Sequence, residues 1–156
     1  MTVEQVKKSE SAEYIGKIEN IMVYEGTVSD LPAVIYYDFD GNKLWSGMYI
    51  IDSDYVNNNL YIRDYDKLKK GLIAKYGNPI HENDEIWYDD LFQDEPRSNW
   101  GTAIAAEQLS LMTVWDVDGT KISLTLTGSD FEVMLGINYS SPEKEQASEE
   151  IDLDDL

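Results

Sequence analysis

A single histidine is the first residue whose chemistry has to be weighed. His81 follows Pro79 in a polar stretch and has Glu82, Asp84 and Glu85 near it in the sequence. An imidazole in this setting could move a proton, but only beside a nucleophile or a second base. The chain has no Gly-x-Ser-x-Gly elbow or other nucleophile motif, so we interpret His81 as an exposed loop histidine and predict no catalytic residue.

Four carboxylates that lie between two tryptophans in the sequence are the second candidate for a catalytic site. Paired carboxylates hydrolyse glycosidic bonds, and a flat indole ring can pack on a sugar. With 31 acidic residues in the chain, such neighbourhoods arise by chance. We therefore predict that the protein is not an enzyme, and we rank glycan binding without hydrolysis above hydrolysis. The carboxylates are Asp89, Asp90, Asp94 and Glu95, and the tryptophans are Trp87 and Trp100.

Two Asp-x-Asp-Gly segments resemble the start of a calcium loop. They are Asp38-Phe39-Asp40-Gly41 and Asp116-Val117-Asp118-Gly119. Carboxylates at alternate positions can converge on a hard cation, but both segments lack the glutamate that closes such a loop. A hairpin turn explains them better than weak calcium binding. Cysteine is absent, which excludes disulfides and cysteine-bound zinc, so we predict no metal site and no cofactor.

The elements that position these residues follow from the pattern of apolar residues. Thr2 with Gln5 three residues later predicts a capped helix over residues 2–10. Runs of β-branched and aromatic residues predict an antiparallel meander over residues 18–24, 32–39 and 43–51. A second helix is predicted to begin at Asp64 as N-cap and to end at Gly77 and Pro79. Strand signals return over residues 85–88, 108–116, 121–127 and 131–139.

The two halves of the chain echo one another. Each offers a helix followed by a meander with a similar Asp-Gly hairpin, so we predict one α+β domain over residues 1–141 with a possible repeat, 1–61 and 62–141. The two units would form one curved antiparallel sheet with both helices on one face, leaving the other face open to a partner. Residues 142–156 are acidic and poor in apolar residues, and we predict a disordered tail, with a short docking segment as the lesser alternative.

The charge of the chain limits its partners. Its 31 acidic and 12 basic residues give a net charge of -19, which repels phosphate backbones and excludes direct nucleic-acid binding. The same charge suits a basic protein partner, divalent cations or mimicry of nucleic acid, although it also serves solubility alone. No apolar run is long enough for a membrane-spanning helix.

Aromatic residues are numerous, with four tryptophans and eleven tyrosines. Most strand aromatics pack against helices, so we predict that Trp115 and Tyr139 belong to the core. Trp45, Trp87 and Trp100 lie near turns or loop edges, and we predict that they are exposed and form the binding residues.

Several stretches resemble uncharacterised secreted or lipid-anchored proteins of Gram-positive bacteria, many of them gut Firmicutes. The arrangement of two helix-plus-sheet units is also similar to the tandem β-lactamase inhibitor proteins and to small envelope lipoproteins of the outer-membrane assembly type. The resemblance implies a secreted or cell-envelope location if a leader precedes Met1, and a cytoplasmic one otherwise. The similar stretches are residues 1–10, Lys75-Tyr76-Gly77-Asn78-Pro79 with Trp87, residues 100–105, Trp115, residues 122–128 and Ile137-Asn138-Tyr139-Ser140-Ser141.

The function that these observations favour is binding. We expect a non-enzymatic binding or accessory domain that recognises a protein or a glycan with its sheet face and aromatic residues. The alternative is an acidic inhibitor that mimics nucleic-acid charge against a basic protein. The sequence predicts neither the ligand nor the oligomeric state.

Overall fold

The computed structural model describes residues 2–9, 11–81 and 83–141 of the chain. The predicted tail, residues 142–156, lies outside the described residues. Among the helices that are described, none is long and apolar enough to cross a membrane.

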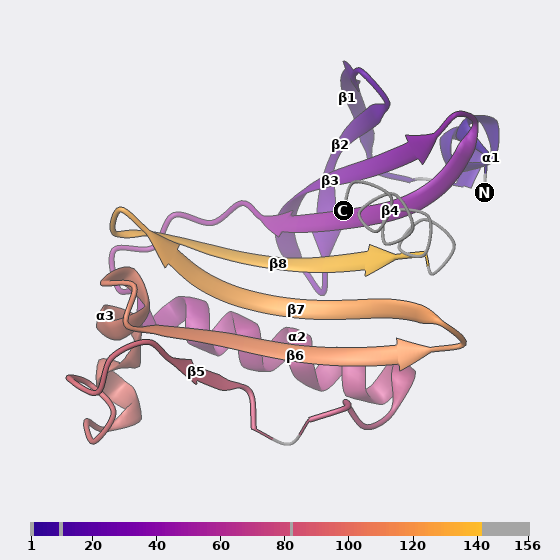
Figure 1. Ribbon diagram of the computed structural model, residues 1–156. Helices are drawn as coiled ribbons and strands as arrows, with labels where there is room; N and C mark the ends of the chain where they lie inside the picture. Colours follow the sequence, from indigo (N-terminus) through magenta and orange to yellow (C-terminus); the bar gives the residue numbers. More distant parts are fainter. Residues whose placement is uncertain (1, 10, 82, 142–156) are drawn as a thin grey trace, which may run out of the picture.

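One eight-stranded antiparallel sheet forms the centre of the molecule (Figure 1). The strand order is β1-β2-β3-β4-β8-β7-β6-β5, so β8, the last strand of the described residues, pairs with β4 and joins the two halves. The elements are α1 (Val3–Ser9), β1 (Glu13–Ile18), β2 (Ile21–Val28), β3 (Leu31–Asp40), β4 (Lys43–Ile51), α2 (Asn59–Tyr76), β5 (Glu85–Trp87), the 3-10 turn η1 (Arg97–Asn99), α3 (Trp100–Ala105), β6 (Leu109–Val117), β7 (Thr120–Ser129) and β8 (Glu132–Ser140).

All three helices pack on the same face of the sheet. Figure 1 shows α2 running behind β6 and β7 while the sheet curves around it. The main core lies between α2, α3 and the second half of the sheet, and a smaller cluster beside α1 contains Met22, Tyr24, Ile35 and Phe39. The predicted α+β fold, a curved antiparallel sheet with helices on one face, is confirmed.

The first helix begins with the predicted capping box. The Gln5 side chain accepts a hydrogen bond from the Thr2 backbone N–H at 2.9 Å, and the Thr2 hydroxyl accepts one from the Gln5 N–H at 3.2 Å. Val3 then packs against the smaller cluster. These reciprocal bonds satisfy N–H groups that the first helical turn leaves open.

The second helix begins earlier than predicted. Its first residue is Asn59, and Asp64, the predicted N-cap, lies inside the helix with 1% of its surface exposed. The Asp64 carboxylate accepts a 2.6 Å hydrogen bond from the Tyr55 hydroxyl and thereby fixes the loop between β4 and α2. The predicted end is confirmed, because Gly77 takes a φ of +87° that suits glycine and its N–H bonds to the Ile73 carbonyl.

Three elements were not predicted: β1, the η1 turn and α3. The edge strand β1 has almost every residue exposed and therefore lacks an alternating pattern. The short helix α3 is held by close backbone approaches at two glycines. A Cβ at Gly128 would overlap the Ile104 carbonyl oxygen, and one at Gly101 would lie 2.6 Å from the Asn59 backbone nitrogen.

Candidate functional site

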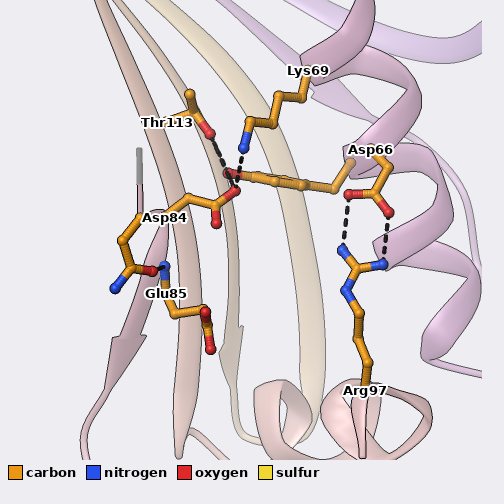
Figure 2. Close-up of polar contacts among 8 residues, drawn as sticks. Asp66, Lys69, Asp84, Glu85, Arg97 and Thr113 are labelled. Atoms are coloured by element: carbon orange, nitrogen blue, oxygen red, sulfur yellow. Dashed lines mark hydrogen bonds and ion pairs between the residues drawn. The ribbon is translucent and has the colours of Figure 1, made fainter. Parts of the chain in front are cut away.

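A group of polar side chains that contact one another lies between α2 and the second half of the sheet. Figure 2 shows Lys69 and Thr113 converging on Asp84, which immediately precedes β5. The Lys69 ammonium is 2.9 Å from the Asp84 carboxylate. The fully buried Tyr65 hydroxyl lies 2.6 Å from the Thr113 hydroxyl and 3.2 Å from the same Asp84 oxygen. A lysine, a tyrosine and a carboxylate can transfer protons, so the pKa of the tyrosine decides whether this group could be reactive.

The electrostatics of this group favour a structural role. Burial raises the pKa of Tyr65 far above its usual value, and the carboxylate of Asp84 raises the pKa further, although the hydrogen bond with Thr113 lowers it. A tyrosine that acts as a base or nucleophile needs the opposite shift. We interpret Tyr65, Lys69, Asp84 and Thr113 as a clamp that fixes α2 to β6 and to the loop before β5.

A second clamp fixes the η1 turn to α2. Arg97 forms two 2.9 Å hydrogen bonds with the Asp66 carboxylate, as Figure 2 shows. The Arg97 guanidinium also lies 5.3 Å from the centre of the Trp100 ring. Because both partners of the ion pair are about half exposed, its contribution to stability is small.

The three tryptophans that we predicted as binding residues do not form one surface. Trp87 and Trp100 pack edge to face with ring centres 5.8 Å apart, and both are half-buried against the main core on the helix-covered side. Trp45 is half-buried in β4, beside an irregularity in the pairing of β3 and β4. A binding role for these residues stays a prediction. Trp115 is 1% exposed and Tyr139 packs against the core, as predicted.

The other sequence candidates lie in exposed loops or turns. His81 and the four carboxylates of residues 89–95 are exposed, and within the described residues no cluster of His, Cys, Asp or Glu could hold a metal ion. The two Asp-Gly segments form the predicted hairpins. Asp118 and Gly119 both take positive φ between β6 and β7, and Gly41 does so between β3 and β4.

The face of the sheet opposite the helices, which we call the open face, carries a broad uncharged surface. Two rows of residues cross the five strands β3, β4, β8, β7 and β6 without a charged side chain. Three of the methionines lie on it or beside it with exposed fractions of 37% to 49%. The first row is Val34, Ile50, Gly136, Thr125 and Met112; the second is Tyr36, Met48, Asn138, Ser123 and Val114; Met134 lies next to Gly136 on β8.

A hollow lies at the centre of the open face, over β8. Gly136 lacks a side chain there, and a hollow of about 220 Å³ is bounded by Met48, Ile50, Thr125 and Met134 among others. Methionine side chains are flexible and polarisable, and they adapt to partners of varied shape. An uncharged hollow walled by flexible apolar side chains suits a protruding apolar group.

Acidic residues border the open face. The strand registers place Glu25 beside Val34, Asp38 two positions beyond Tyr36, and Asp116 two positions beyond Val114. Glu132 lies two positions before Met134. The strand registers also place two lysines at this border, Lys121 opposite Asp116 and Lys43 opposite Asp40. The open face therefore combines an uncharged centre with a border that attracts cations.

The sequence predicted an open face but not its composition. Met48, Met112 and Met134 are far apart in the chain, and the pairing of β4 with β8 brings them together. Their position at alternate, outward-facing places in predicted strands was the available signal.

No family model, curated protein or solved structure matches this chain. The resemblance to secreted proteins of Gram-positive bacteria therefore stays a prediction.

Proposed function

We propose that this protein is a non-enzymatic binding domain that holds a cationic, partly apolar segment of another protein against the open face of its sheet. The observation that carries the proposal is the pair of uncharged rows with exposed methionines inside an acidic border. Apolar burial supplies affinity, and the border selects the sign of the partner's charge. The net charge of -19 disfavours a second copy of this chain as the occupant.

A protein partner is favoured over a glycan. Sugar binding generally uses an aromatic ring with one face available, whereas Trp87 and Trp100 are half-buried against the core and pack edge to face, and Arg97 lies over the Trp100 ring. The open face offers methionine and aliphatic side chains, which bind apolar protein groups. Of the two ligand classes that the sequence favours, a protein or a glycan, we therefore propose a protein.

The test uses labelled peptides of defined sequence. Fluorescence anisotropy measures binding of an amphipathic Leu/Lys peptide, a Leu/Glu peptide of the same pattern, and a Ser/Lys peptide with the same charge. We expect the Leu/Lys peptide to bind most tightly, and the double variant Met112→Ser with Met134→Ser to weaken it by about tenfold. Leu91→Ser, which removes a more exposed apolar side chain from the loop after β5, is the control outside the open face.

Two outcomes would contradict the proposal. Equal binding of the Leu/Glu peptide would show that the acidic border does not select charge. An unchanged affinity of the double methionine variant would show that the open face is not the site.

The second candidate is an acidic inhibitor that mimics nucleic-acid charge, and the net charge of -19 supports it. In that case the Ser/Lys peptide would bind as well as the Leu/Lys peptide. Its binding would weaken steeply as salt rises, because charge would supply all of the affinity. The apolar contribution of the open face predicts that part of the Leu/Lys affinity survives high salt.

A further inference from the structure

The hairpin between β7 and β8 ends in an exposed aromatic residue with an unfavourable backbone conformation. Asp130 and Phe131 take φ values of +51° and +65°. Glycine, asparagine and aspartate tolerate this region, whereas it is a genuine outlier for a bulky residue such as phenylalanine. The other hairpin turns of the described chain place Gly, Ser, Asp or Glu at their positive φ positions.

The fold itself gives no reason for a phenylalanine at this place. The Phe131 side chain is 77% exposed and belongs to neither hydrophobic cluster. The hairpin is held by nine paired positions, from Lys121 with Ser140 to Ser129 with Glu132, so the turn residue is not needed to set the register. A strained, exposed aromatic side chain that does not stabilise the core is typical of a contact residue.

The surroundings of Phe131 define the chemistry of what it contacts. The side chain forms one wall of a hollow of about 340 Å³ that also contains Asp54, Tyr55 and Glu132. Asp54, Asp130 and Glu132 are exposed, and the lining of this hollow includes no basic residue. An apolar tip ringed by carboxylates fits an apolar pocket with cationic groups at its mouth.

The tip is continuous with the open face. Asp130, Glu132 and Met134 line a second hollow along the end of β7 and β8. Glu132 and Met134 belong to the open face or its border, and Glu132 also lines the hollow that Phe131 borders, so the two hollows adjoin at Glu132.

We propose that Phe131 is an anchor that enters an apolar, cation-bordered pocket on the protein that binds the open face. The inference rests on the proposed function and adds a contact outside the sheet. It also gives the partner a second property, since the partner must contain a pocket as well as a cationic segment.

The probe for this contact is a β-cyclodextrin with an amino group at each rim position, which offers an apolar cavity bordered by cations. We measure its binding by titration calorimetry, with neutral β-cyclodextrin as the comparison. The amino form is expected to bind at least several-fold more tightly than the neutral form. Phe131→Gly abolishes binding, while Tyr88→Ser, which removes another highly exposed aromatic residue, leaves it unchanged.

Urea unfolding of the same variants separates an anchor from a structural residue. Phe131→Gly is expected to raise the unfolding midpoint, because glycine accepts the positive φ without strain. A clearly lower midpoint would overturn the proposal, since it would show that Phe131 serves the fold. Equal binding of both cyclodextrins, or binding that survives Phe131→Gly, would also overturn it.

The peptide assay keeps the two proposals apart. If Leu/Lys peptide binding depends on the methionines but the cyclodextrin does not bind Phe131, the proposed function is supported and the proposed Phe131 anchor is wrong. Phosphatidylcholine vesicles test whether Phe131 contacts lipid and not a protein. Sedimentation of the protein with vesicles that requires Phe131 would overturn the protein anchor in favour of a lipid contact.

Discussion

Raising the pH above 10 tests whether the Tyr65 clamp is structural. The pKa of Tyr65 is raised by burial first and by Asp84 in addition, so the folded protein keeps this hydroxyl protonated where the unfolded chain loses the proton. Stability from a raised pKa is fully present below the unfolded value near 10 and declines as pH rises above it. The free energy of unfolding is therefore expected to fall in alkaline solution.

The size of the effect follows from proton linkage. For a tyrosine that ionises near pH 10 only when unfolded, the loss is about 1.4 kcal/mol at about pH 11. Burial also raises the pKa of Tyr139, where Tyr76 adds to the shift, so this half-buried residue contributes in the same direction. Tyr65→Phe removes the hydroxyl that titrates in the clamp and should remove about 1.4 kcal/mol of the decline between about pH 9 and about pH 11.

Urea unfolding followed by far-UV circular dichroism gives the free energy at each pH. Tyr88→Phe is the matched control, because this substitution removes a tyrosine hydroxyl from a side chain that is 64% exposed. A Tyr65→Phe variant whose stability declines with pH as steeply as the parent would refute the reasoning. That result would mean that the folded protein ionises Tyr65 readily, and a reactive role for the clamp would have to be reconsidered.

Three further predictions concern the packing and the open face. Gly128→Ala should lower the free energy of unfolding by about 3 kcal/mol in urea, because the added Cβ overlaps the α3 backbone. Gly47→Ala is the control: its Cβ would make ordinary contacts of 3.6 Å or more, so the free energy of unfolding should change by less than about 1 kcal/mol. Asn59→Ala removes the 2.9 Å bond from the Gly101 N–H and should cost about 1–2 kcal/mol, with faster amide exchange in α3; unchanged exchange would contradict this. Mild peroxide treatment followed by peptide mass spectrometry should leave the fully buried Met22 intact and oxidise the open-face methionines, and comparable oxidation of Met22 would disprove the assigned faces. These methionines are Met48, Met112 and Met134.

Strand positions were the best predicted part of this molecule. Alternation of apolar and polar residues is a local signal, and β3, β4, β6, β7 and β8 all carry it. The start of α2 was predicted wrongly because Asp64 has the side chain of a good N-cap, yet its carboxylate is needed by Tyr55 in the folded protein. A capping preference read from one residue type cannot include a contact that only the tertiary structure creates.

The candidate site depended on information that a local pattern lacks. The open face exists because β4 pairs with β8, and residues 46–50 and 136–140 share no sequence feature that announces this pairing. The exposed Phe131 was assigned to a strand, since the backbone angle that makes it unusual is invisible in the sequence. The predicted tryptophans were chosen for their positions near turns and loop edges, but Trp87 and Trp100 pack on one another and are half-buried.

The pairing of β4 with β8 has a consequence for synthesis on the ribosome. After β4 has been made, its outer edge has no partner until β8 emerges, and the whole of residues 52–131 must be translated in between. An unpaired strand edge of this kind invites pairing with other chains. The nascent protein therefore faces its greatest danger of aggregation in that interval, and a chaperone that shields β4 would be most useful then.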